Sequence, residues 1–399
     1  NGDHQGSGRV GGDGVMAKVK DIAMQIRGVS YHPEDLHDNL DEDSVVLLRA
    51  NNIKDGKLIL DDVVYVSKSK VAEQQYLQTG DILICASSGS KELVGKAAFV
   101  DSVKNPMTFG AFCKVVRPQP EYSEYLGHYF NSPVYRRKIS ALSAGANINN
   151  IKNEHIDNLD IQLVDEKERR EIITILNELN MLISLRKQQI AKLDELVKAR
   201  FVEMFGDISN SRKVPMQDVC KIITDGTHQS PKFVLSGIPF LFVSNIVTNE
   251  IHYDAEKFIS EETYNELIKR TPIEVGDVLL STVGSYGHPA VVKENKPFCF
   301  QRHIAYLKPN NSVVNSEYLR CAILSTDLQR QIDESVKGIA QKTLNLSEIR
   351  KLRLPLPSLS LQNQFAAFVE RVDQQKQTVQ QSLEKLELMK KALMQEYFG

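Results

Sequence analysis

The stretch KLDELVKARFVEMFG, residues 192–206, returns in altered form at the end of the chain as KLELMKKALMQEYFG, residues 385–399. The offset between the copies is 193 residues, because the closing glycines stand at positions 206 and 399. The same shift aligns further pairs: Asn52-Ile53 with Asn245-Ile246, Tyr125-Leu126 with Tyr318-Leu319, Ile139 with Ile332, and Gly145 with Gly338. So long a period is not that of a solenoid and predicts a duplicated module, a globular domain followed by a long helix.

The composition is that of an ordinary globular chain with room for two or three domains: 399 residues, 42% hydrophobic and 25% charged. No apolar run of about eighteen residues and no apolar leader occurs, so neither a membrane span nor secretion is expected. The five cysteines form no Cys-x-x-Cys pair, which favours the cytoplasm over a disulfide framework or a zinc site. The net charge of −2 leaves room for a local basic groove.

Two long helices follow from the heptad spacing of apolar residues. The first begins at Asp165, with Glu168 as its capping-box partner, and runs to Met204. About forty residues span roughly 60 Å as a helix. The predicted coiled-coil seam consists of Ile172, Leu176, Leu179, Ile183, Ile190, Leu193, Val197 and Met204 in the first helix, and of Phe365, Val369, Val372, Val379, Leu383, Leu386, Leu393 and Tyr397 in the second.

Basic residues interrupt this seam, namely Arg186 and Arg200 in the first helix and Lys376 and Lys390 in the second. Two explanations stay open. Their aliphatic stems could cover the seam while the charges reach water. Alternatively, polar seam residues could fix the register and orientation of the helices.

The globular parts are rich in strands. In the first copy, the runs SVVLL, KLILDDVVYV, DILICA, GKAAFV and AFCKVV are apolar and β-branched, and PFLFVSNI, GDVLLSTV, PAVVK and HIAYLK follow the same pattern in the second. A helical stretch closes each series. The predicted fold class is α+β: two pseudo-symmetric α/β domains separated by two long helices that pack as an antiparallel coiled coil. We expect a tag or disordered tail over 1–15, domains at 16–155 and 207–348, and helical segments at 156–206 and 349–399.

Catalytic signatures are weak. Asp277 with Glu294 and Lys296 resembles a nuclease arrangement, but the first copy has Gly80-Asp81 without the Glu-x-Lys pair. The histidines at positions 228, 288 and 303 show no metal-ligand spacing, and no set of nucleophile, base and oxyanion donors is found. We therefore expect no catalytic residue and no metal site. The duplication favours a protein that binds two similar targets.

The junctions between domains and helices resemble those of a known family. The segments LSAGANINNIKNEHIDNLDIQLVDEKERREI and VKGIAQKTLNLSEIRKLRLPLPSLSLQNQF share a Gly, a polar turn, an Ile/Leu-rich strand and an acidic or Gln-rich helix start. With GDILICASSGS and GDVLLSTVGSYG, they are similar to specificity subunits of type I restriction–modification enzymes over essentially all of residues 16–399. The first copy departs from the usual Leu-Pro-Pro junction with Leu163-Val164-Asp165.

This resemblance implies a non-catalytic, DNA-binding specificity subunit of a prokaryotic host-defence system, located in the cytoplasm. Each domain would be a target recognition domain for one half of a split, asymmetric double-stranded DNA target, and the helices would set the gap. Two modification (methyltransferase) subunits with S-adenosylmethionine would dock on the helices and carry out DNA methylation. Restriction subunits would add ATP- and Mg-dependent translocation and cleavage. No cofactor is expected in this chain, and no membrane partner.

In such a protein, phosphate contacts would position the domains and base-edge contacts would read the sequence. The predicted DNA-binding residues are polar or basic residues of equivalent loops. In the first copy they are Arg27, Ser30, Tyr31, Ser87, Ser88, Ser90 and Lys91, with Arg136, Arg137 and Lys138 as phosphate ligands. In the second copy they are Thr227, His228, Gln229, Lys232, Ser281, Thr282, Ser285, Tyr286, His288, Gln301, Arg302, Gln341 and Lys342.

Two other functions stay open from the sequence. A duplicated coiled-coil scaffold or adaptor without sequence-specific DNA binding fits the near-neutral charge, and salt-dependent DNA binding would argue against it. A nuclease built on Asp277, Glu294 and Lys296 would cleave DNA with metal and without partners.

Overall fold

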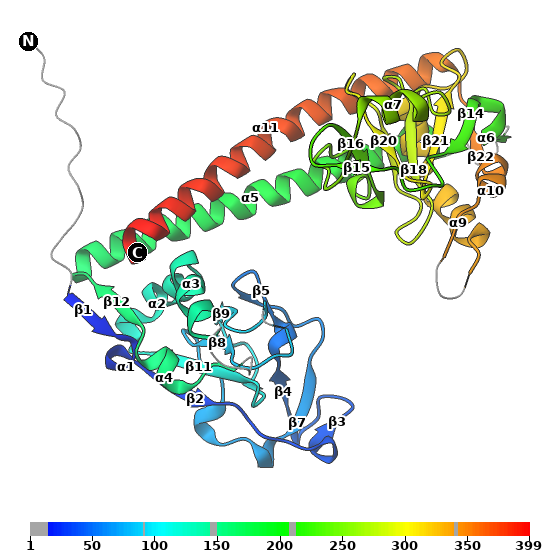
Figure 1. Ribbon diagram of the computed structural model, residues 1–399. Coiled ribbons are helices and arrows are strands. Elements are labelled where there is room, and N and C mark those ends of the chain that lie inside the picture. Colours follow the sequence, from blue (N-terminus) through cyan, green and yellow to red (C-terminus); the bar gives the residue numbers. More distant parts are fainter. Residues whose placement is uncertain (1–14, 91, 144–149, 207–212, 339–341) are drawn as a thin grey trace, which may run out of the picture. The chain divides into compact units, whose positions relative to one another are not determined.

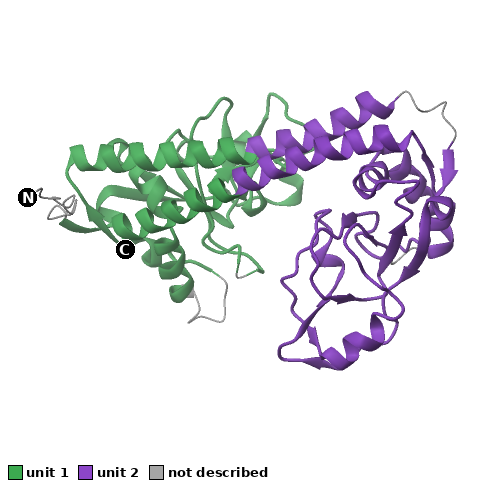
Figure 2. Cartoon of the chain, turned by 90° about the horizontal axis from the view of Figure 1, so that it is seen from above, with its two compact units in different colours: residues 1–187, 381–399 green, residues 188–380 purple. Residues whose placement is uncertain are grey.

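The computed structural model describes residues 15–90, 92–143, 150–206, 213–338 and 342–399. The chain divides into two compact units: unit 1 comprises residues 1–187 and 381–399, and unit 2 comprises residues 188–380. Each unit takes part of both long helices, as the colours of Figure 2 show.

The two long helices are α5 (Glu166–Phe205) and α11 (Leu359–Phe398), each of 40 residues (Figure 1). The predicted start of α5 is confirmed, because the backbone N–H of Glu168 donates to Asp165 Oδ1 at 2.9 Å. Ion pairs between the helices join Lys187 to Glu387 in unit 1 and Asp194 to Lys376 in unit 2, both at 2.9 Å. Rising numbers in α5 thus meet falling numbers in α11, which is the antiparallel order.

The predicted seam lies between these helices. Its buried members are Ile172, Leu176, Leu179, Phe365, Val369, Val372, Val379 and Leu383, and its half-buried members are Ile183, Ile190, Leu193, Val197, Met204, Leu386, Leu393 and Tyr397. Apolar residues off the seam, such as Met181, Leu185 and Leu388, are exposed. The heptad pattern therefore identifies the contact stripe of both helices.

Two of the basic seam residues make polar contacts between the helices. Lys376 Nζ lies 2.9 Å from Asp194 Oδ1 on α5 and 3.4 Å from Glu250 Oε1. Arg186 Nε donates to Ser382 Oγ on α11 at 3.2 Å. Because these contacts need one alignment of the helices, they favour a role in register for Lys376 and Arg186.

The domain of unit 1 contains two four-stranded sheets. The first is antiparallel, in the order β2 (Ala23–Arg27), β11 (Cys113–Pro118), β8 (Ile82–Cys85), β9 (Ala97–Phe99). The second has the order β10 (Met107–Phe109), β4 (Ser44–Leu48), β7 (Val64–Ser67), β3 (Leu36–His37), and only β10 and β4 are parallel. Two short antiparallel pairs are β1 (Val15–Lys18) with β12 (Asp160–Leu163) and β5 (Ile53–Lys54) with β6 (Lys57–Leu58).

The domain of unit 2 repeats this plan. Its antiparallel sheet has the order β14 (Cys220–Asp225), β21 (Ile304–Pro309), β18 (Val278–Ser281), β19 (Pro289–Val291). Its mixed sheet has the order β15 (Phe233–Val234), β17 (Phe258–Ile259), β16 (Ile238–Leu241), β20 (Cys299–Phe300), and again only one pair, β16 with β20, is parallel. The pair β13 (Lys213–Pro215) with β22 (Arg353–Pro355) corresponds to β1 with β12.

Short helices complete both domains. Unit 1 has α1 (Val19–Ile22), α2 (Ser123–Phe130), α3 (Pro133–Ser143) and α4 (Asn153–Asp157). Unit 2 has the counterparts α6 (Met216–Val219), α8 (Ser316–Ile323), α9 (Thr326–Ser335) and α10 (Leu346–Lys351), and in addition α7 (Glu261–Leu267). Three-residue 3-10 segments stand at equivalent places, η2 (Ala50–Asn52) and η7 (Val243–Asn245).

Buried polar anchors explain why some residue pairs survive in both copies. Asn52 is buried; its Oδ1 accepts from the backbone N–H of Arg49 at 2.8 Å, and its Nδ2 donates to the carbonyl of Ile59 at 2.8 Å. Asn245 makes the same contacts with Phe242 N–H at 2.9 Å and with the His252 carbonyl at 3.0 Å. Each side chain therefore ties a 3-10 turn to the loop that follows it.

The repeated helix ends insert a phenylalanine into a domain core. In unit 1, Phe398 at the end of α11 packs edge-on against Tyr125 and Tyr129, with centroids 5.1 and 5.8 Å apart. In unit 2, Phe205 at the end of α5 packs against Tyr318 at 4.9 Å. The two motifs thus have the same role: each completes the apolar core of the domain in its own unit.

Four local predictions differ from the structure. The run KLILDDVVYV forms two strands, β6 and β7, because Asp61-Asp62 lies in a bend between them. The helical stretch before residue 144 is split into α2 and α3 at Pro133, where Ser132 Oγ accepts from the backbone N–H of Tyr135 at 3.1 Å. Val15, assigned to the tail, begins β1, and the boundary after His155 cuts α4.

Candidate nucleic-acid interface

Three loop segments of unit 1 meet at one end of the antiparallel sheet. Because β11 runs antiparallel to β2 and β8, the ends of those two strands lie beside the start of β11. The backbone N–H of Ala111 donates to the Val29 carbonyl at 2.9 Å, and the N–H of Ala86 donates to the Phe112 carbonyl at 2.9 Å. We call residues 27–31, 86–90 and 110–112 loop face 1.

The corresponding segments of unit 2 meet through the same bonds. The N–H of Arg302 donates to the Thr227 carbonyl at 3.1 Å, and the N–H of Thr282 donates to the His303 carbonyl at 2.9 Å. Residues 226–232, 282–288 and 301–303 form loop face 2. The backbone of the two loop faces is therefore equivalent, whereas their side chains differ.

A glycine holds each loop face together. A Cβ atom at Gly28 would stand 2.2 Å from the carbonyl oxygen of Gly110, and one at Gly226 would stand 2.2 Å from that of Phe300. No other residue permits this approach of backbone to backbone. The loops after β2 and β14 can therefore reach the turns before β11 and β21 only through a glycine.

Loop face 1 brings together six of the predicted DNA-binding residues. Arg27, Ser30 and Ser90 are exposed, and Tyr31, Ser87 and Ser88 are half-buried. Their hydroxyl and guanidinium groups can donate to or accept from base edges and phosphates. The prediction for Lys91 lies outside the described residues.

Loop face 2 collects a larger predicted set. Its exposed members are His228, Gln229, Lys232, Ser285 and Arg302, and its half-buried members are Thr227, Tyr286, His288 and Gln301. Lys342 is exposed beside it, since the N–H of Gly284 donates to the Lys342 carbonyl at 3.3 Å. Gln341 lies outside the described residues.

Two residues of the predicted set are placed inside the domain. Ser281 and Thr282 are 0% and 5% exposed, and Ser281 Oγ accepts from the backbone N–H of His288 at 2.9 Å. Ser281 is the last residue of β18, and Thr282 follows it directly. Burial argues against direct DNA contact by these two side chains in this conformation.

The two histidines of loop face 2 have different surroundings. His228 is exposed, and its Nε2 lies 2.9 Å from Asp225 Oδ2, while Arg270 pairs with the other oxygen of that carboxylate. His288 is half-buried beside Asn249, and burial lowers its pKa. His288 is therefore suited to neutral hydrogen bonding, whereas His228 keeps its Nδ1 edge available to a ligand.

Comparison with known proteins identifies the family. The family model for the type I restriction modification DNA specificity domain matches the chain twice, over residues 18–195 and 209–388. The chain belongs to this family. Each match covers one copy of the duplicated module, so the repeat seen in the sequence is a repeat of the specificity domain.

Individual relatives agree with this family. The chain is 31% identical to the type I restriction enzyme EcoKI specificity subunit of Escherichia coli K12 over 284 residues, which cover 67% of this chain and 61% of that protein. It is 30% identical to the StySPI specificity subunit of Salmonella potsdam over 382 residues, covering 90% of this chain and 81% of the relative. The match to the first relative thus spans less than two thirds of its length.

Solved structures share the fold of this specificity-domain protein. A structure from work on complex assembly and conformational transition of the type I R-M system aligns with a TM-score of 0.56 at 17% identity, covering 97% of this chain and 98% of the other. The type I restriction–modification S subunit from M. genitalium aligns with a TM-score of 0.53 at 13% identity, covering 98% of both chains.

The basic triplet on α3 of this family member is engaged within unit 1. Arg136 Nη1 donates to the Val94 carbonyl at 2.9 Å, and Lys138 Nζ donates to the Asp160 carbonyl at 3.1 Å. Arg137 donates to Gln395 on α11. Because all three side chains bind protein acceptors, these contacts favour structural roles, and a role as phosphate ligands stays a prediction.

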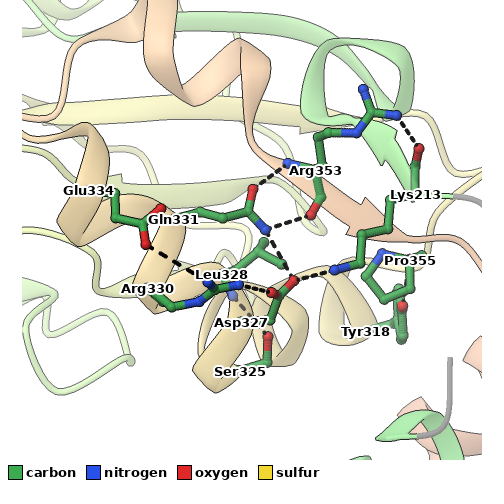
Figure 3. A network of polar contacts seen from close by, with 10 residues as sticks. All are labelled: Lys213, Tyr318, Ser325, Asp327, Leu328, Arg330, Gln331, Glu334, Arg353 and Pro355. Atoms are coloured by element: carbon green, nitrogen blue, oxygen red, sulfur yellow. Dashed lines mark hydrogen bonds and ion pairs between the residues drawn. The ribbon is translucent and has the colours of Figure 1, made fainter. Parts of the chain in front are cut away.

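Unit 2 fills two of these positions with glutamine, and both side chains donate to carbonyls of the corresponding loop and strand. Gln329, equivalent to Arg136, donates to the Gly287 carbonyl at 2.9 Å. Gln331, equivalent to Lys138, donates to the Arg353 carbonyl at 2.9 Å and accepts from the Arg353 N–H at 2.9 Å (Figure 3). An uncharged residue thus suffices, which supports the structural explanation.

Figure 3 also shows how this network joins the first and last strands of the domain. Asp327 on α9 accepts from Lys213 Nζ at 2.8 Å and from Gln331 Nε2 at 3.1 Å, and Arg353 Nη2 donates to the Lys213 carbonyl at 2.7 Å. Lys213 begins β13 and Arg353 begins β22. The first and the last strand of the domain, β13 and β22, are therefore both hydrogen-bonded to α9.

The residues of the nuclease hypothesis serve other purposes. Asp277 is buried, accepts from Tyr306 Oη at 2.7 Å and from the backbone N–H of Glu274 at 2.8 Å, and burial raises its pKa. Glu294 and Lys296 form an exposed ion pair at 2.6 Å. Among the described residues, no group of His, Cys, Asp and Glu could hold a metal ion, and no helix is long and apolar enough to cross a membrane.

One prominent residue of loop face 1 was missed. Phe112 is exposed in the turn before β11, and its counterpart before β21 is His303. The 193-residue shift does not align these two turns, because loop lengths differ between the copies. The pairing becomes visible only from strand register, with Cys113 opposite Cys85 and Ile304 opposite Ser281.

Proposed function

We propose that the chain is the non-catalytic DNA-specificity subunit of a type I restriction–modification complex. Loop face 1 reads one half of a split, asymmetric target, and loop face 2 reads the other. The observation that carries this proposal is the contrast between equivalent backbones and different side chains. The segment Gly110-Ala111-Phe112 and its counterpart Gln301-Arg302-His303 occupy the same place and present different chemistry.

Charge supports an unequal division of phosphate contacts between the two faces. Within the described part of the chain, loop face 2 exposes Lys232, Arg302 and, beside it, Lys342, and loop face 1 exposes Arg27. Each cation that neutralises a phosphate releases a counterion and steepens the dependence of binding on salt. Removal of Arg302 should therefore reduce the salt dependence of DNA binding more than removal of an uncharged loop residue.

The helices supply surfaces for the partner subunits. Met181 and Leu185 on α5 and Leu388 and Met389 on α11 are exposed, although the seam between the helices is closed without them. Exposed apolar side chains of this kind mark protein contacts. We assign them to two modification subunits, which would bring S-adenosylmethionine; restriction subunits would bring ATP and Mg.

The direct test is co-expression of the chain with its modification subunit, followed by methylome sequencing. The expected result is adenine methylation in one two-part motif with an unspecified gap. Methylation that does not depend on this chain, or a single continuous motif, would refute the proposal. A DNA mobility shift of the complex at two salt concentrations separates DNA binding from a purely structural adaptor, since phosphate contacts weaken with salt.

A further inference from the structure

Phe112 is the feature of loop face 1 that the structure leaves unexplained. Its side chain is 70% exposed, although the residues on either side of the turn, Phe109 and Cys113, are fully buried. A phenylalanine has no polar group to place in water. If loop face 1 contacts DNA, this ring is the part of it that offers an exposed aromatic surface to a base.

The backbone of this turn holds the ring outward. The N–H of Cys113 donates to the Gly110 carbonyl at 2.8 Å, which closes the turn. The Phe112 carbonyl accepts two bonds, from the N–H groups of Ala86 at 2.9 Å and Ser87 at 3.0 Å. Because the peptide group is fixed to the loop after β8, the ring is presented by a rigid support.

The same position in unit 2 carries a different side chain on the same support. The carbonyl of His303 accepts from the Thr282 N–H at 2.9 Å, as that of Phe112 accepts from Ala86. His303 is half-buried and follows the exposed Arg302. One turn is thus apolar and the other polar and basic, which is the difference expected of two readers with different targets.

We propose that Phe112 is a specificity residue that contacts an apolar part of a base in the half-site read by loop face 1. This inference rests on the proposed function. A phenyl ring makes apolar contact with a thymine methyl group or wedges against a base that has been partly unstacked. The hydroxyl groups of Ser30, Ser87 and Ser88 lie in the same loop face and supply the hydrogen bonds that a phenyl ring cannot.

The test uses the complex with its modification subunit and a duplex containing the motif found by methylome sequencing. Phe112→Ala should weaken binding about tenfold or more, within the range measured for loss of an aromatic–base contact. Phe112→Leu, which keeps apolar bulk, should lose less. The slope of affinity against salt should stay unchanged, because the ring neutralises no phosphate. Specificity should be relaxed only in one half-site, the one that changes when the domain of unit 1 is replaced by that of another family member.

Leu60→Ala is the matched control. Leu60 is also an exposed apolar residue of unit 1, but it lies outside loop face 1 and precedes Asp61-Asp62, whose charges repel phosphate. This variant should bind with wild-type affinity. Thermal unfolding of both variants checks that the fold is retained, and if Phe112→Ala does not fold, the Leu variant carries the measurement.

Two DNA modifications distinguish the forms of contact. Replacing thymine by uracil, position by position, should remove the Phe112 contribution at one site if the ring meets a methyl group. A fluorescence rise from 2-aminopurine that Phe112→Ala abolishes would show a wedge. Wild-type affinity and an unchanged motif for Phe112→Ala would overturn the inference while leaving the proposed function intact. Absence of a two-part motif with the wild-type chain would overturn the proposed function itself.

Discussion

Units 1 and 2 share one backbone plan but fasten their domains to the helices with different chemistry. In unit 2, Arg320 Nε lies 2.7 Å from Glu317 Oε2 on α8, and Lys293 pairs with both Glu317 and Asp373 of α11. At the places equivalent to Glu317 and Arg320, unit 1 has Glu124 and Gly127. The ionic fastening of unit 2 is therefore absent from these positions of unit 1.

Unit 1 uses a buried histidine instead. His128 on α2 is 8% exposed, close to Asn177 on α5 and Lys390 on α11, and burial lowers its pKa to about 4 despite a hydrogen bond with Asn177. Asn177 Nδ2 also donates to Glu124 at 3.0 Å. The counterpart of His128 in unit 2 is Cys321. The comparison shows that the duplicated halves kept their hydrogen-bonded backbone while the charged contacts diverged, so acid and salt should affect them differently.

The largest effect should come from the matched helix ends. Phe398→Ala removes a ring that is 5% exposed and packs on Tyr125 and Tyr129, and should destabilise unit 1 by about 3–5 kcal/mol. Phe205→Ala should do the same to unit 2. Hydrogen exchange resolved by peptide is the measurement. If either variant loosened both units equally, the assignment of one ring to each core would be wrong.

Acid should destabilise unit 1 through His128. The pKa of His128 is lower in the folded chain, about 4, than its ordinary value of 6.5. Between these values the unfolded chain binds a proton that the folded chain excludes, so stability falls as pH falls from about 6.5 to 4, by about 3 kcal/mol in all. Unfolding of unit 1 followed across this range checks the prediction.

His128→Cys installs the residue that unit 2 has at this place. Although the smaller side chain lowers stability at neutral pH, the slope of unit 1 stability between pH 6.5 and 4 should flatten. A slope identical to that of the wild type would show that other groups dominate the acid response.

The ionic fastening of unit 2 should have an intermediate effect. Glu317→Gln leaves the mostly buried Arg320 without its charged acceptor and should destabilise unit 2 by about 2 kcal/mol. The matched change Glu124→Gln in unit 1 affects an exposed carboxylate and should alter stability by less than about 0.5 kcal/mol. Equal losses in denaturant titrations would contradict the contrast drawn between the units.

The smallest effect concerns the seam lysines. Burial and Lys187 lower the pKa of half-buried Lys390, whereas Lys376 has its pKa raised by Asp194 and Glu250 although burial opposes this. Lys390→Val, which copies the counterpart Val197, should stabilise unit 1 by about 0.5–1 kcal/mol. Lys376→Ile, which copies Ile183, should be close to neutral. A loss of stability for Lys390→Val would indicate a role for its charge.

The long helices and the duplication were the features that the sequence predicted most fully, because both depend on regular spacing. The heptad stripe identified residues of both long helices that are buried or half-buried, and Asp165 was placed correctly as the cap. The duplication itself was visible because helices and junction strands keep their length. These features depend on local spacing, which a linear sequence displays directly.

The loop faces could be predicted only in part. Polarity selected Arg27, Ser30 and Arg302 for surfaces where they are indeed exposed. Polarity also selected Ser281, which strand register buries, and Lys138, whose acceptor is a carbonyl 22 residues away. Phe112 was not among the predicted DNA-binding residues. An apolar residue next to a strand looks like a core residue as long as the position of the turn is unknown.

The central claim is that each unit reads one half of the target independently. The most direct measurement replaces residues 15–164 with the matching domain of another family member and sequences the methylome of cells that express the chimera with its modification subunit. The account predicts that one half of the methylated motif changes while the other half is retained. A motif altered in both halves, or in neither, would contradict it.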